Sequence, residues 1–249
     1  MGGAPAQHSA ASRKIEFLRG IRDTLPMMLG ALPFGVIFGT LAVSKGLSAW
    51  EAMALSLFVF SGSAQFIAVI LVGAGATIWV VWFATLVLNL RHLLYAATLV
   101  DHVRHLSQAW RFPLAAWLTD ETFAVMERRY RLQGGGGNAH WYYLGSCISM
   151  YVNWQFWSLI GVTAGERFPE VKDWGLEFAM IATFTGIVVP ALISRPFVAA
   201  AVVAGTVATV ANPLPYKLGL MLGGLAGIAA GLLLDEWKRR QARAGSLAA

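Results

Sequence analysis

Residues 77–100 read TIWVVWFATLVLNLRHLLYAATLV, and this stretch decides the fold class. It is apolar almost throughout, and its polar residues gather around Arg91. A helix needs about 20 consecutive, mainly apolar residues to cross the hydrocarbon core of a bilayer, so the stretch predicts a transmembrane helix. Arg91 lies some residues from either end of it, where a permanent charge is costly and needs a partner or water.

The composition of the whole chain points to the same class of protein. Of its 249 residues, 57% are hydrophobic and only 13% are charged, and the mean hydropathy is +0.60. Soluble domains carry roughly 25% charged residues, so a soluble, disordered or nucleic-acid-binding protein is excluded. The net charge of +6 is expected instead from basic residues that collect in cytoplasmic loops.

Apolar runs recur along the chain and predict an all-α, polytopic membrane protein with seven or eight transmembrane helices, several of them broken or short. The runs cover residues 25–43, 49–72, 77–100, 112–126, 141–164, 176–194, 197–211 and 218–234. The fourth run is short, so a span, a re-entrant segment and a surface helix all stay open for it. Eight crossings with both termini in the cytoplasm satisfy the positive-inside rule best, although they leave Arg104 and Arg111 on the outer side.

The chain divides by composition into a tail, one membrane domain and a second tail. Residues 1–24 are expected to form a cytoplasmic polar tail, 25–234 a single transporter domain, and 235–249 a cytoplasmic basic tail. Four glycines at 134–137 predict a flexible linker between possible halves, 25–132 and 141–234. Sparse matches at an offset of 122–124 residues, such as Gly39 with Gly161, suggest that the halves are an internal repeat.

Small and polar residues interrupt the second run at Ser61, Gly62 and Ser63, with Gln65 close behind. A helix break in lipid needs protein or water to satisfy its backbone groups. Transporters use such breaks to bind substrate near the bilayer midplane, so these four residues are candidate substrate-binding residues. A notch for close helix packing is the alternative. The glycine row at 219, 223 and 227 has the spacing of close helix packing.

Arg91 and its neighbours Asn89 and His92 are the next candidates. The planar guanidinium of Arg91 suits bidentate binding of a substrate carboxylate. Its alternative is a structural ion pair with a nearby carboxylate, or a side chain that reaches toward Asp101. His92 is a candidate proton carrier because histidine titrates near neutral pH, and a buried neutral ring is its alternative.

Two adjacent carboxylates, Asp120 and Glu121, lie in the short fourth run. Neighbours on a helix point about 100° apart, so one can pair with Arg91 while the other exchanges a proton. A helix cap at Thr119 or Asp120 is the alternative. Asn153 lies in the middle of the fifth run, where its amide predicts a hydrogen bond between helices or a place in the substrate cavity.

Enzyme signatures are missing from the sequence. It contains no H-E-x-x-H, no G-x-S-x-G and no phosphate-binding loop, and Cys147 is its one cysteine. We therefore expect no enzymatic activity, no cofactor and no metal.

Several of these segments, in this order and spacing, resemble the AzlC family. They are FGVIFG at 34–39, SGSAQF at 61–66, NLRHLLY at 89–95, TDETF at 119–123 and LEFAMIATF at 176–184. The resemblance implies a permease of the bacterial inner membrane that acts with a small AzlD-type membrane subunit. It also implies export of branched-chain amino acids driven by the proton gradient.

The leading hypothesis is therefore a proton-coupled exporter of small apolar amino acids. A channel-like pore for a small polar solute and a structural subunit of a membrane complex are the alternatives. Dependence on the proton gradient separates the exporter from the pore, and substrate binding by this chain alone separates both from the structural subunit.

Overall fold

The computed structural model describes residues 10–134, 138–168, 194–214 and 218–247, together with residues 185, 189 and 192. All regular structure in these residues is helical, which confirms the predicted all-α class. The chain divides into two compact units, Met1–Gly73 with Val81–Leu176, and Ala74–Val80 with Glu177–Ala249. Most of the predicted span 176–194 lies outside the described residues.

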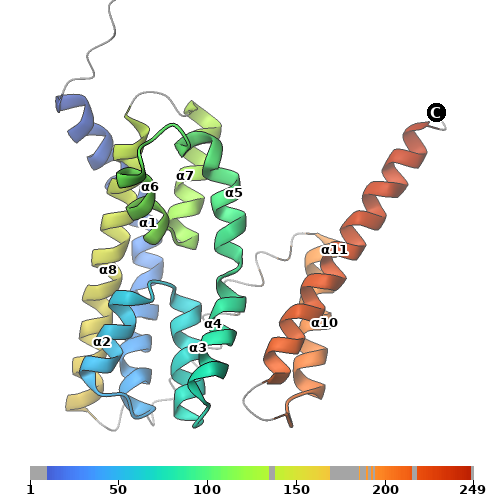
Figure 1. The fold of residues 1–249 in the computed structure, drawn as a ribbon, viewed down its shortest axis with the longest axis horizontal. Helices are drawn as coiled ribbons and strands as arrows, with labels where there is room; N and C mark the ends of the chain where they lie inside the picture. Colours follow the sequence, from blue (N-terminus) through green and yellow to red (C-terminus); the bar gives the residue numbers. More distant parts are fainter. Residues whose placement is uncertain are drawn as a thin grey trace, which may run out of the picture. The chain divides into compact units, whose positions relative to one another are not determined.

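The first unit is a bundle of long and short helices (Figure 1). In chain order they are α1 (Ala10–Ser44), α2 (Ala49–Phe58), α3 (Gly62–Gly73), α4 (Ile78–Asn89, whose first residues fall within the second unit), α5 (Arg91–Val103), α6 (Gln108–Ala116), α7 (Asp120–Gln133) and α8 (Ala139–Arg167).

Helices α1 and α8 lie side by side and run in the same direction (Figure 1). Thr24 donates a hydrogen bond to the hydroxyl of Ser146 (2.7 Å), and further along Thr40 donates to the carbonyl oxygen of Gly161 (3.1 Å). A Cβ added at Gly161 would lie 2.2 Å from the carbonyl oxygen of Val36, so the two backbones touch there. Small residues thus hold the pair together, as they do in membrane proteins generally.

Gly39 lies on the other side of this contact. A Cβ added there would lie 2.3 Å from the carbonyl oxygen of Ser158 and 2.8 Å from the carbonyl carbon of Gly161. Gly39 and Gly161, which match in the suggested repeat, therefore face each other. The offset of the repeat, 122–124 residues, is close to the sequence separation of the residues that contact each other between α1 and α8. The division into related halves stays a prediction.

Residues 49–72, predicted as one span, turn back halfway. Helix α2 begins just after the end of α1, where Ser48 caps it. Helix α3 ends beside the same place, because a Cβ added at Gly73 would lie 2.9 Å from the Cβ of Lys45. The two helices form a re-entrant hairpin, hairpin 1, whose turn at 59–61 lies inside the unit (Figure 1). The predicted single crossing is wrong, because two short apolar helices have the same length and apolarity as one span.

The fourth predicted run also turns back, from the opposite end of the unit. At the start of α6 the ring of Trp110 lies 4.7 Å from that of His140, at the start of α8. Near the end of α7 Tyr130 stacks on His102, at the end of α5 (4.0 Å). Helices α6 and α7 therefore form hairpin 2, with its turn at 117–119, so this run turns back and does not form one straight span.

The turns of the two hairpins meet on one residue of α8, Tyr151. Its ring lies 4.9 Å from that of Phe60 in hairpin 1 and 5.6 Å from that of Trp117 in hairpin 2. Its hydroxyl donates a hydrogen bond to the carbonyl oxygen of Leu57 (3.1 Å). These contacts hold both turns near the middle of α8.

Helices α4 and α5 continue each other through Leu90, whose backbone stays helical (φ −56°, ψ −27°). Among the described residues, two helices are long and apolar enough to cross a membrane, Ser12–Ser44 and Ile78–Val103. Shorter apolar helices are Ala49–Phe58, Gly62–Gly73 and Arg195–Val210. The 77–100 stretch thus forms one long helix with a break beside Arg91.

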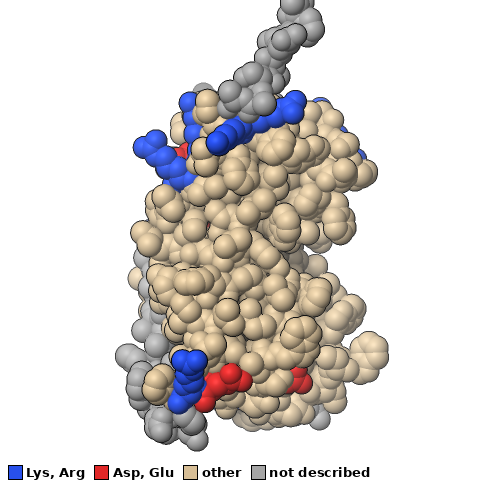
Figure 2. Space-filling view, turned by 90° about the vertical axis from the view of Figure 1, so that its left-hand side faces the viewer, with Lys and Arg blue, Asp and Glu red and all other residues tan. Residues whose placement is uncertain are grey.

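Basic residues gather at one end of the first unit, which we call the basic end. In the described part of the chain this end carries Arg13, Lys14, Arg19, Arg22, Arg104, Arg111, Arg128, Arg129 and Arg131, whereas the opposite end carries Lys45 and Arg167. Figure 2 shows one face of this unit, with charged side chains at its two ends and an uncharged band between them. Because α6 enters from the basic end, Arg104 and Arg111 join the other cations there.

The second unit contains α10 (Arg195–Val210) and α11 (Leu218–Leu247), which lie side by side (Figure 1). A Cβ added at Gly223 would lie 2.6 Å from the carbonyl oxygen of Ala204, and one at Gly227 would lie 2.6 Å from that of Ala200. The predicted role of this glycine row in close packing is confirmed.

Candidate functional site

Three interruptions in the helices of the first unit are linked by side chains. They are the turn of hairpin 1, the break at Leu90, and the turn of hairpin 2. The polar residues beside them form two sets of contacts, which we together call the Arg91 site. Ser63, Arg91, Asp120 and Tyr95 are linked in one set, and Ser61 pairs with Asn89 in the other. All except Tyr95 were predicted as functional residues.

Arg91 bridges the two hairpins. Its Nη2 donates a hydrogen bond to the hydroxyl of Ser63 in hairpin 1 (2.8 Å), and its Nη1 lies 3.0 Å from Oδ2 of Asp120 in hairpin 2. Its Nε is buried and has no hydrogen-bond partner among the described residues. A buried donor without an acceptor costs about 1–3 kcal/mol. Of the three guanidinium nitrogens, Nε therefore lacks an acceptor, while Nη1 and Nη2 each have one.

Asp120 is the carboxylate that pairs with Arg91. Its other oxygen, Oδ1, accepts a hydrogen bond from the Tyr95 hydroxyl (2.6 Å). Thr119 supplies the helix cap of α7, since its side chain accepts from the backbone N–H of Thr122 (3.3 Å). The cap and the ion pair thus use different residues. Glu121, one position on, is half-buried and forms no ion pair with Arg91 in the described structure.

The pair remains partly open to its surroundings. The Arg91 side chain is 32% exposed and the Asp120 side chain 44% exposed. Exposure of this size leaves room for a small molecule to reach the charged groups. An ion pair that water or a ligand can reach is held less tightly than one sealed in a core.

Tyr95 is the member of the site that the sequence analysis missed. It follows Arg91 by four residues on α5, so both side chains lie on the same face of that helix. Its ring stacks on Phe123 of α7 (4.3 Å between centroids). The four-residue spacing between Arg91 and Tyr95 is the signal that could have identified Tyr95, since any partner of Arg91 on this face also lies within reach of Tyr95.

Asn89 and His92 flank the break at Leu90. Oδ1 of Asn89 accepts a hydrogen bond from the Ser61 hydroxyl (2.7 Å), which ties α4 to the turn of hairpin 1. Nδ1 of His92 lies 3.1 Å from the carbonyl oxygen of Asn89. The imidazole is thus bonded to its own helix, and its ring contacts Tyr95 edge-on at 5.6 Å.

Gln65 and Gly62 hold the turn of hairpin 1 in place. Gln65 is fully buried, and its Nε2 donates to the carbonyl oxygen of Val59 (2.5 Å) while its Oε1 accepts from Nε1 of Trp154 (3.1 Å). A Cβ added at Gly62 would lie 3.0 Å from the Trp154 ring. Both residues therefore pack the turn against α8 and do not contact Arg91.

Asn153, another predicted substrate-binding residue, lies between α1 and α8. Its Nδ2 donates to the carbonyl oxygen of Met28 (3.2 Å), and its Oδ1 accepts from Nε1 of Trp157 (3.2 Å). This is the hydrogen bond between helices that the sequence analysis gave as one of its two readings. Gln155 similarly pairs with Ser56 of α2 (2.8 Å).

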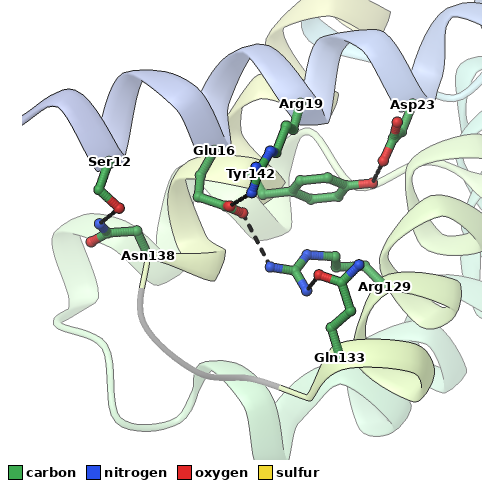
Figure 3. A network of polar contacts seen from close by, with 8 residues as sticks. All are labelled: Ser12, Glu16, Arg19, Asp23, Arg129, Gln133, Asn138 and Tyr142. Atoms are coloured by element: carbon green, nitrogen blue, oxygen red, sulfur yellow. Dashed lines mark hydrogen bonds and ion pairs between the residues drawn. The ribbon is translucent and has the colours of Figure 1, made fainter. Parts of the chain in front are cut away.

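A second polar network ties α1, α7 and α8 together at the basic end (Figure 3). Glu16 accepts from Arg19 (2.7 Å) and pairs with Arg129 of α7 (3.1 Å). Arg129 also donates to Gln133. The hydroxyl of Tyr142 donates to Asp23 (2.8 Å), so α8 is joined to α1 as well. Within the described residues, no cluster of His, Cys, Asp and Glu is placed to hold a metal ion.

A family model described as AzlC protein matches residues 26–168. The chain belongs to the AzlC family. The matched segment runs from α1 to the end of α8, so it contains both hairpins and the whole Arg91 site. No solved structure matches the chain.

Several relatives have names that describe membrane or transport proteins. A membrane protein of Helicobacter pylori is 34% identical, with 68% of this chain and 74% of the relative covered. The inner membrane protein YgaZ of Escherichia coli is 27% identical over 68% of this chain and 70% of its own. The branched-chain amino acid transport protein AzlC of Bacillus subtilis is 27% identical over 73% and 71%. Family and relatives together support a membrane protein with a role in transport.

Proposed function

We propose that this chain is a secondary transporter that exports branched-chain amino acids across the bacterial inner membrane in exchange for protons. It works with a small AzlD-type membrane subunit, and both of its termini lie in the cytoplasm. Membership of the AzlC family and the name of the Bacillus subtilis relative support the substrate class. The observation that carries the mechanism is the position of Arg91 between two re-entrant turns.

The substrate carboxylate binds to Arg91 in this proposal. A guanidinium binds carboxylates through paired N–H groups, and the buried Nε–H of Arg91 has no acceptor in the described structure. A carboxylate that uses Nε and one Nη nitrogen supplies the acceptor that Nε lacks in the described structure. It also competes with Ser63 or Asp120 for the Nη nitrogens that they occupy.

Proton coupling follows from that competition. Without substrate, the Asp120 carboxylate pairs with the Arg91 guanidinium at 3.0 Å. When the substrate carboxylate takes its place beside Arg91, Asp120 loses this support and accepts a proton. Substrate and proton then alternate at one guanidinium, which is the exchange that an antiporter needs. Glu121 and His92 lie beside this pair and take secondary places in the proton path.

The aromatic contact around Tyr151 supplies the apolar part of the site. Phe60 and Trp117 pack against Tyr151 where the two hairpin turns meet. An aliphatic side chain placed there is shielded from water, which favours apolar amino acids. Phe66 takes no part in this contact, since it is 2% exposed and packs edge-on against Phe38.

Two hairpins that enter from opposite ends suit alternating access. Each hairpin contributes one partner to Arg91, Ser63 from hairpin 1 and Asp120 from hairpin 2. Release of one partner frees one hairpin while the other stays attached. Broken helices that meet near the midplane serve this purpose in other transporters.

The test is export from cells loaded with a valine-containing dipeptide, with the small subunit co-expressed. Arg91→Ala removes a charge-assisted hydrogen bond worth about 1.5–3 kcal/mol, so we expect valine efflux to fall roughly ten- to hundred-fold. Arg104→Ala is the matched control, because Arg104 is exposed and contacts only Asp101 at a long 3.6 Å. Wild-type efflux from the Arg91→Ala variant would refute the proposal.

The two alternative functions are tested in the same system. Collapse of the proton gradient stops uphill export by an exchanger but leaves flux through a pore intact. Binding of valine by the purified chain without the small subunit, lost in Arg91→Ala, excludes a purely structural subunit.

A further inference from the structure

We propose that a basic hollow between α1 and α7 binds the phosphate of an anionic phospholipid headgroup. The hollow has a volume of about 390 Å³, and α8 closes it through Tyr142. Three arginines line it, Arg22 of α1 with Arg128 and Arg129 of α7, against one carboxylate, Asp23. It lies at the basic end and is separate from the Arg91 site.

Two of the four charges that line the hollow, Arg129 and Asp23, already have partners. Arg129 is committed to Glu16 and Gln133 and lies over the Tyr142 ring (5.3 Å), while Asp23 accepts from the Tyr142 hydroxyl (Figure 3). Each charge in that network is therefore held by a neighbour.

The two remaining cations have no such partner. Arg22 and Arg128 are exposed, and neither forms an ion pair with any described residue. Two arginine side chains from different helices thus border one hollow, and their charges can bind an anion there. Arginine forks match the oxygens of a phosphate group, and such pairs are stronger than neutral hydrogen bonds.

The position along the helices indicates a lipid as the source of the phosphate. Arg22 lies just before the apolar run 25–43, and Arg128 lies just after the apolar residues of α7. Both therefore lie where polar sequence gives way to apolar sequence, which is the headgroup level of a membrane protein. Basic pockets between helices on the cytoplasmic side are places where anionic headgroups bind.

The other walls of the hollow are apolar. Pro26 and Met27 continue the α1 side, and Leu132 lies on the α7 side. A free phosphate ion gains nothing from such walls, whereas the glycerol and the first methylenes of a phospholipid cover them. The hollow thus combines charge for a phosphate with apolar surface for the rest of a lipid.

The experiment measures retention of phosphatidylglycerol by the full-length protein. Protein purified in detergent is titrated with phosphatidylglycerol or with zwitterionic phosphatidylcholine, and bound lipid is counted by native mass spectrometry. We expect the wild type to retain phosphatidylglycerol preferentially. Arg22→Ala and Arg128→Ala should each weaken that retention roughly five-fold, since each cation near an anionic lipid surface contributes about that factor.

Arg131→Ala is the matched control, because Arg131 lies on the same helix and at the same end but pairs with Glu127 outside the hollow. Helix content and thermal stability in phosphatidylcholine are measured for all variants, and the exposed positions of Arg22 and Arg128 predict wild-type values. Equal losses in the control and the two variants, or none in any, would overturn the proposal.

A competition arm identifies the source of the phosphate. Inorganic phosphate and glycerol phosphate are added to the protein with bound phosphatidylglycerol. Continued lipid retention supports a lipid site. Displacement by inorganic phosphate at concentrations comparable to those of the lipid would overturn it in favour of a site for a free anion.

Discussion

Arg91 is held by one partner from each hairpin, and a third member of the site, Tyr95, holds Asp120 in place. The Tyr95 hydroxyl donates to Asp120 at 2.6 Å, and hydrogen bonds to a charged group contribute about 1.5–3 kcal/mol. Tyr95 is therefore a positioning residue that keeps the Asp120 carboxylate beside Arg91.

We expect Tyr95→Phe to lower valine efflux roughly ten-fold or more, because the Asp120 carboxylate then loses a hydrogen bond that holds it beside Arg91. The measurement is valine efflux from dipeptide-loaded cells. Tyr143→Phe is the control, since Tyr143 is a buried tyrosine in the core formed with Tyr130 and Cys147. Wild-type efflux from Tyr95→Phe would remove Tyr95 from the site.

The residues of the site were largely predictable, and the reason is chemical. Arg91 and Asp120 are charged residues in apolar runs, where an unpaired charge is costly, so their pairing follows from the sequence. Gln65, Gly62 and Asn153 make the contacts between helices that the sequence analysis gave beside substrate binding, because an amide or a glycine in lipid meets the same need through a neighbouring helix as through a ligand. Their place in a substrate site stays a prediction. Tyr151 was missed, since nothing in the sequence marks where two turns meet.

At the scale of helices, close contact between α1 and α8 sets the frame on which the hairpins rest. Gly161→Ala places a methyl group 2.2 Å from the carbonyl oxygen of Val36, which forces the two backbones apart. We expect a loss of stability of about 1–3 kcal/mol, the usual cost of overpacking, seen as a lower unfolding temperature in detergent.

Gly30→Ala is the paired control for this prediction. Gly30 also lies in a helix, α1, but an added Cβ meets nothing within 4 Å. Alanine favours helices over glycine by about 0.5–1 kcal/mol, so this variant should be as stable as the wild type or slightly more so. Equal destabilisation by both substitutions would contradict the close contact.

The hairpins could not be predicted from hydropathy, because a pair of short apolar helices and one long span have the same composition. Their breaks were visible at Ser61, Gly62 and Ser63 and at Thr119. What the sequence does not contain is the direction of the chain after a break. That direction depends on contacts far along the chain, such as Gly73 with Lys45 and Trp110 with His140.

For the whole molecule, the hairpins change which loops share a side of the membrane. If residues 49–72 and 112–126 each crossed once, the segments near Ser44 and Arg104 would lie on the same side. With both runs re-entrant, Arg104 lies at the basic end with Arg13, and Ser44 lies at the opposite end. Removal of two crossings from eight leaves an even number, so the expectation that both termini share one side is unchanged.

Cysteine labelling in whole cells tests this arrangement. In a Cys147→Ala background, Arg104→Cys and Arg13→Cys should resist a membrane-impermeant maleimide, and Ser44→Cys should react with it. The positive-inside rule places the basic end in the cytoplasm, which is why the reagent cannot reach it. Reaction at both Ser44→Cys and Arg104→Cys from outside would contradict the two hairpins.

The central claim is that substrate and Asp120 alternate at Arg91, and the most direct measurement follows protons and valine together. The transporter with its small subunit is reconstituted into liposomes that contain a pH indicator, and a valine gradient is applied. We predict that the wild type moves protons against valine, whereas Asp120→Asn exchanges valine for valine without moving protons, and Glu121→Gln still moves them. Valine-driven proton movement at the wild-type rate in Asp120→Asn would contradict the account.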